Sequence, residues 1–161
     1  MSYKSFRLKV KEIIEAEKTS IGLKAVYSPL PPFVPIDKYP LVAIQINRQF
    51  AEGPAITGGV FRPELIVNVW IQIMEIERNS IEKLRENPDI CSRIQDDIDD
   101  ITWKTAEVLR KNRSLLSEAV ETNIRGIDMI WKPSLYVAGA IVAGSVIEFG
   151  GKMKDFEVDM V

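Results

Sequence analysis

The segment Glu64–Glu77 (ELIVNVWIQIMEIE) constrains the fold of this chain more than any other. Its odd-numbered positions are apolar through most of its length: Leu65, Val67, Val69, Ile71 and Ile73. Because successive side chains of a strand point to opposite faces, this alternation predicts a β-strand with one buried face. The even-numbered positions are mixed, with Trp70, Met74 and Ile76 among polar residues. Since a sheet buried on one side has a polar second face, we expect a helix or a neighbouring subunit to cover part of this one.

Two segments have the apolar spacing of amphipathic helices. Phe6, Val10, Ile13 and Ile14 predict an N-terminal helix, which Thr19, Ser20 and Gly22 end. A stripe of Ile94, Ile98, Ile101, Thr105, Val108 and Leu109 predicts the main helix over Ser92–Asn112. Further strands are expected at Leu23–Tyr27, Leu41–Asn47, Ile124–Lys132 and Tyr136–Phe149. Shorter helical pieces are expected at Ser80–Asn87, which Pro88 ends, and at Ser114–Thr122.

Three connecting or terminal segments stand apart from these elements. Ser28–Pro40 contains five prolines, which predict a stiff, irregular loop. Residues 48–63 predict a long glycine-containing loop, of a length that is usually functional or mobile. Residues 152–161 form a potential C-terminal arm, whose apolar residues, Phe156 and Val158 among them, alternate with acids in a strand pattern. Such an arm can close the sheet of its own chain or add to a neighbour's edge.

The order of these elements predicts an α+β fold. We expect a mostly antiparallel sheet of about four to five strands, packed with the N-terminal helix and one long central helix. The 161 residues fit a single domain, 1–161, that can bury a core without disulfides or metals.

Composition argues against several classes of function. The chain has no histidine, which excludes Ser-His-Asp and Cys-His catalysis and removes the commonest metal ligand. Its single cysteine excludes an internal disulfide and a thiolate metal cage. A net charge of -2 provides no basic field for nucleic acid or an anionic membrane. The longest apolar stretch, Tyr136–Ile147, is too short for a membrane-spanning helix. We therefore expect a non-catalytic, cytosolic protein without cofactors.

The one carboxylate cluster is Asp96, Asp97, Asp99 and Asp100. Its oxygens suit Mg²⁺ or Mn²⁺, so a metal-dependent hydrolase that uses Asp96–Asp100 is an alternative function. The interpretation we favour is structural: acids in the first turns of the main helix offset the positive end of its dipole. No metal site is therefore predicted.

Trp103 is the strongest candidate for an interface. At helical spacing it lies about 180° from the isoleucine stripe, on a polar face with Asp99 and Arg110. Tryptophans in such places are enriched at binding hot spots, although a second packing surface within the chain is the other explanation. Further interface candidates come from the strand, the long loop and the C-terminal arm: Met74, Ile76, Phe50, Phe61, Phe156 and Val158.

Taken in order, the segments YPLVAIQIN, FRPELIVNVWIQIM and SRIQDDIDDITWKTAEVLRKN, with an opening helix and two closing strands, resemble the tail terminator (tail completion) proteins of long-tailed phages. The resemblance spans nearly the whole chain. It implies a structural virion protein that forms a ring, commonly of six copies, caps the tail tube, ends its polymerisation and joins the tail to the neck or head. Its partners would be copies of itself, the tube protein and a connector protein, in a virion assembled in the host cytoplasm.

The resemblance carries no catalytic residues. Another head–tail connector or neck protein on a similar fold remains an alternative, as does a partner-binding module of cellular origin.

Overall fold

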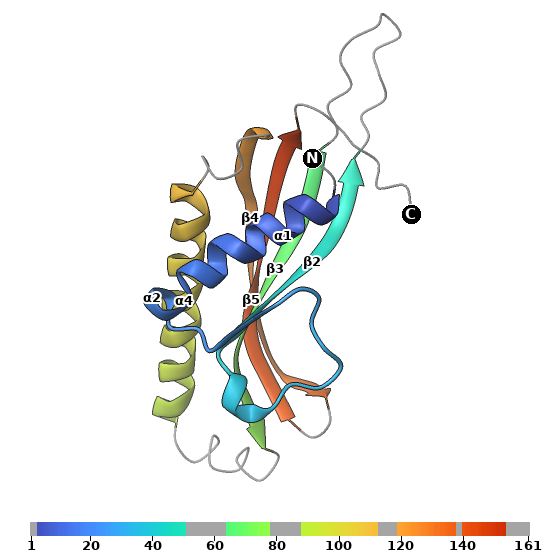
Figure 1. Cartoon of the computed structure of the whole chain (residues 1–161). Helices are drawn as coiled ribbons and strands as arrows, with labels where there is room; N and C mark the ends of the chain where they lie inside the picture. The colour runs from blue at the N-terminus through green and yellow to red at the C-terminus, as the bar shows by residue number, and fades with distance from the viewer. Residues whose placement is uncertain (1–2, 51–63, 78–87, 113–118, 138–139, 154–161) are drawn as a thin grey trace, which may run out of the picture.

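The computed structural model describes residues 3–50, 64–77, 88–112, 119–137 and 140–153 (Figure 1). Its elements, in chain order, are α1 (Tyr3–Ala16), α2 (Lys18–Ile21), β1 (Ala25–Tyr27), the 3-10 helix η1 (Ile36–Lys38), β2 (Leu41–Phe50), β3 (Glu64–Glu77), α4 (Pro88–Lys111), β4 (Ala119–Val137) and β5 (Ala140–Met153). The predicted mixture of helices and strands is confirmed. No helix of the described residues is long and apolar enough to cross a membrane.

The described strands pair in the order β1-β2-β3-β5-β4. β1 runs parallel to β2, and the other three pairings are antiparallel. In Figure 1, α1 crosses in front of the strands and α4 runs along them at one side. Apolar residues of both helices share one core with β2, β3 and β5, so both helices lie on the same face of the sheet.

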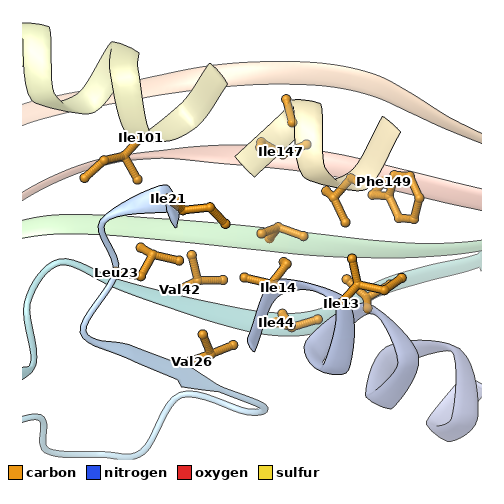
Figure 2. Close-up of a cluster of buried hydrophobic side chains, with 14 of the residues drawn as sticks. Ile13, Ile14, Ile21, Leu23, Val26, Val42, Ile44, Ile101, Ile147 and Phe149 are labelled. Carbon is orange, nitrogen blue, oxygen red and sulfur yellow. The ribbon is translucent and has the colours of Figure 1, made fainter. Parts of the chain in front are cut away.

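The core between the helices and the sheet is built from the stripes that the sequence predicts. Phe6, Val10, Ile13 and Ile14 of α1 are buried, as are Ile94, Ile98, Ile101, Thr105 and Leu109 of α4. Figure 2 shows Ile13, Ile14 and Ile101 gathered with Val42, Ile44 and Ile147 of the strands. The ring of Phe6 also stacks on that of Phe149 at 6.0 Å between centroids, which ties α1 to β5.

A buried pair of hydroxyls fixes how α4 sits on β5. The Oγ1 of Thr102 and the Oγ of Ser145 are 2.6 Å apart, and both residues are buried. Thr105 satisfies its own hydroxyl by donating to the carbonyl of Ile101 at 2.8 Å. Because a buried hydroxyl without a partner is costly, this pair disfavours sliding or rotation of α4 on the sheet.

β3 has the predicted bounds, but its alternation is interrupted. Gln72 lies opposite Gly144 and Met74 lies opposite Ala143, so Ile73 is the extra residue of a β-bulge. An inserted residue exchanges the two sets of alternating positions. Beyond it, Met74 and Ile76 occupy the register that odd-numbered residues hold before it. The assumption of one unbroken alternation, which grouped Met74 and Ile76 with Trp70, was wrong.

The proline-rich segment covers part of the second face of the sheet. Leu41 and Ala43, which alternate with Val42 and Ile44, are buried in a separate cluster with Val34 of that segment. Leu30 and Tyr39 pack against the same cluster. Among the described residues, therefore, a loop of the same chain covers this face at β1 and β2, where we expected a helix or a subunit.

Several predicted boundaries were wrong for the strands. β2 continues to Phe50, past the predicted start of the loop at residue 48, and a bulge between Ile46 and Arg48 bends it. Residues 119–122 belong to β4, where a helical turn was predicted. Pro133 lies within β4, at a register shift between Trp131 and Tyr136, and does not separate two strands. β5 extends through Met153 and so takes in the start of the predicted arm.

The helix boundaries also differ. α1 ends at Ala16, and a separate helix α2 follows, which Gly22 ends in the left-handed conformation at φ 93°. Pro88 begins α4, because proline suits the first turn of a helix, where no backbone N–H is needed. The predicted helix Ser80–Asn87, the loop residues 51–63 and the arm residues 154–161 lie outside the described residues.

The buried stripe of α1 predicts a large difference between two neighbouring positions. Phe6→Ala should lower the free energy of unfolding by about 3–5 kcal/mol, because it removes the stacked ring and leaves a cavity. Leu8→Ala on the same helix, where Leu8 is 43% exposed, should change it by less than about 1 kcal/mol. Urea denaturation of both variants measures this, and equal losses would contradict the packing described.

Candidate association surface

The outer face of α4 is the one surface where a sequence-predicted candidate is seen clearly. Ile98, Ile101 and Leu109 hold the opposite face of this helix in the core. The face turned away from them carries Trp103, which is 65% exposed. The predicted placement of Trp103 on a polar, outward face is confirmed, and the alternative of a second packing surface within the described residues is not.

An open groove lies beside Trp103. Its walls come from the C-terminal half of α4, with Lys104 and Val108, and from α2, with Ser20 and Ile21. Its volume is about 610 Å³. The floor is partly apolar while the rim is charged, a combination typical of a surface that binds another macromolecule.

Ion pairs along α4 order the rim of this groove. Lys104 contacts Asp100 at 2.7 Å, and Arg110 donates to both oxygens of Glu107 at 2.9 and 2.8 Å. Lys111 approaches Glu107 at 3.2 Å. The hydrogen bonds from Arg110, and then from Lys111, lower the pKa of the Glu107 carboxyl below its usual value. Since these pairs are exposed, each adds little stability, but together they hold charged groups around Trp103.

The explanation predicted for the four aspartates was wrong. α4 begins at Pro88, so the carboxylate in its first turn is Asp89, and Asp96–Asp100 lie in the third and fourth turns. The helix dipole acts mainly within the first turn and does not account for them. Asp99 accepts a hydrogen bond from Gln95 at 3.2 Å, and Asp100 pairs with Lys104. No cluster of acids able to hold a metal ion is found in the part of the chain that the structure describes.

The other interface candidates are not gathered at α4. Phe50 ends β2 opposite Glu64, and the backbones of Met74 and Ile76 belong to the β3 edge of the β3–β5 pairing; the side chains of these three are not described. Phe61, Phe156 and Val158 lie outside the described residues. Of the predicted candidates, the structure therefore brings together only Trp103, Asp99 and Arg110, which share one helix.

Sequence reasoning missed an exposed aromatic in the proline-rich segment. Phe33 is 78% exposed, whereas its neighbour Val34 is buried against the sheet. The flanking Pro32 and Pro35 restrict the backbone on both sides. A large apolar residue between prolines was the available signal, since a stiff loop cannot readily turn both residues inward.

No protein-family model and no curated protein matches this chain. The argument for a function therefore rests on the residues and geometry of the chain itself.

Replacing Trp103 should leave the fold almost intact. Because most of the ring is in solvent, Trp103→Ala should change the free energy of unfolding by less than about 1 kcal/mol. Chemical denaturation at a protein concentration low enough to keep the chain dissociated measures this. A loss as large as that of a core residue such as Leu109→Ala would show that the ring is part of the fold.

The lowered pKa of Glu107 predicts a pH dependence. The ionised form contributes stability above the usual pKa of 4.5, and this contribution is lost as the pH falls through the lower pKa of the folded state. Glu107→Gln should therefore be less stable than the parent at neutral pH, with a difference that shrinks below pH 4.5. Thermal unfolding across this range measures it. Arg110→Gln should reproduce part of the effect, and a pH-independent difference would contradict it.

Proposed function

We propose that this chain is a structural subunit of a tailed virus that forms a ring, caps the end of the tail tube and joins the tail to the neck. The proposal takes as its fold the mostly antiparallel sheet of about four to five strands, packed with the N-terminal helix and one long central helix. Its function in this proposal is to bind other proteins, and no reaction is assigned to it.

The observation that carries the proposal is the exposed tryptophan on α4. A tryptophan left 65% in solvent loses the benefit of burial, and the surrounding groove offers a partly apolar surface. α4 is also held rigidly, through its isoleucine stripe and the Thr102–Ser145 contact. A rigid helix that presents an aromatic residue suits a fixed contact between subunits, because little flexibility is lost on binding.

The chemistry of the chain supports binding over catalysis. Without histidine, a general base would have to be a carboxylate, a lysine or another less common group. The acids that a hydrolase would need are Asp96–Asp100, and two of these are already engaged by Gln95 and Lys104. No observation therefore favours the metal-dependent hydrolase over the structural role.

A ring also needs contacts that are not symmetric. Each copy must present one patch to the neighbour before it and a different patch to the neighbour after it. Phe33, exposed on the proline-rich segment, provides a second apolar group on an element distinct from α4. β4 is an end strand of the described sheet, but its register shifts and Pro133 make its outer edge irregular, which limits unrestricted strand pairing.

The proposed function predicts a closed ring that binds tube ends. Native mass spectrometry and electron microscopy of the purified chain should show a ring, commonly of six copies. Added to tube protein of the same virus during polymerisation, the chain should end growth and appear at one end of each tube. Binding to an isolated connector, with no effect on tube length, would favour the neck protein instead. A chain that stays monomeric and binds neither would contradict the proposal.

A further inference from the structure

The charges of α4 are separated along its length, with Trp103 at the boundary. The part before Trp103 carries five carboxylates and one arginine, a net charge of -4. The part after it carries three cations and one glutamate, a net charge of +2. Asp96, Trp103 and Arg110 are spaced by seven residues, two turns of helix, so they form a single stripe on the outer face. Both Asp96 and Arg110 are exposed.

The packing of a single copy does not account for this separation. Asp96 and Asp97 lie more than two turns from the start of α4, beyond the reach of the helix dipole. They make no ion pair within the described residues. At the other end, two cations, Arg110 and Lys111, share the single carboxylate of Glu107. Each copy thus presents unpaired negative charge on one side of Trp103 and surplus positive charge on the other.

We propose that α4 pairs with α4 of a second copy of this chain, antiparallel, about a two-fold axis that passes beside Trp103. An antiparallel arrangement places Asp96 of each copy opposite Arg110 of the other, because both lie seven residues from Trp103. The acidic half of each helix then faces the basic half of its partner. A parallel arrangement would instead bring the acidic halves together, which charge repulsion opposes.

The groove gives the contact an apolar centre. The two Trp103 rings meet near the axis, and the space of about 610 Å³ beside each ring accepts part of the other copy. Arg110 can turn to the partner's Asp96 while Lys111 continues to hold Glu107. A helix of 24 residues is about 36 Å long, which is enough for the full stripe to take part.

This pairing rests on the assembly role proposed above and names the partner of its surface. A two-fold contact closes with two copies and does not itself build a ring. Combined with ring contacts elsewhere, it joins two rings through their α4 faces. The complete assembly then contains an even number of copies, and loss of the α4 contact alone halves its mass.

A charge exchange tests the orientation of the two helices. At low ionic strength, where charge contacts are least screened, native mass spectrometry should find the paired assembly for the parent. Asp96→Arg and Arg110→Asp, made singly, should each halve the mass. The double variant, with both changes, should restore it, because each new arginine again faces an aspartate. Single variants with the parent's mass, or a double variant that stays halved, would overturn the proposal.

Crosslinking tests the position of the axis with a matched pair of lysines. The side chains of Lys104 and Lys38 are 49% and 48% exposed, and each pairs with an aspartate. In a Cys91→Ser background, Lys104→Cys treated with a short bismaleimide should give covalent dimers, since residue 104 lies next to the axis. Lys38→Cys, on η1, should give far fewer. Equal yields from the two variants would overturn the two-fold contact.

The same measurements separate failure of this pairing from failure of the proposed function. If the parent is a single ring that Lys104→Cys does not crosslink, the ring stands and the pairing is overturned. If the parent is a dimer that Lys104→Cys crosslinks, and no ring forms with or without tube protein, the pairing stands and the tail role falls.

Discussion

The structure depends on one face of a sheet that buries two amphipathic helices together. The apolar stripes of α1 and α4 meet Val42, Ile44 and Ile147 in a single core, and Phe6 stacks on Phe149. Hydrophobic burial sets how closely the helices approach, but it has no direction. The buried contact between Thr102 and Ser145 supplies the direction, because sliding or rotation of α4 would leave a buried hydroxyl without its partner.

That constraint decides what the outer face of α4 presents to solvent. With the isoleucine stripe held inward, the opposite stripe of Asp96, Trp103 and Arg110 has to face outward. The surface is therefore a consequence of the core rather than a separate feature. The same rigidity makes the surface suitable for a contact of fixed geometry, since little order has to be gained on binding.

The second face of the sheet follows different physics. A proline-rich segment packs Val34 onto Leu41 and Ala43, where a helix would be the usual cover. Backbone restriction by proline lowers the entropy lost when such a loop is ordered. Its neighbour Phe33 is then turned to solvent, so burial of one residue of the segment leads directly to exposure of another. The bulge at Ile73 acts in a similar way on β3, because one inserted residue changes which positions of a strand share a row.

The sequence by itself determined what repeats along the chain. Helical spacing placed α1, the body of α4 and the outward position of Trp103, and strict alternation placed β3 to the residue, because both periods are local properties of the backbone. It could not determine the extra residue at Ile73, the role of Pro88 as a helix start or the cover of Leu41 by Val34. Each of these depends on which segments meet across the fold. The tertiary structure alone decided that Asp96–Asp100 lie mid-helix, beside a groove that α2 completes. A groove shared by two elements, α2 and α4, forms only when packing brings them together.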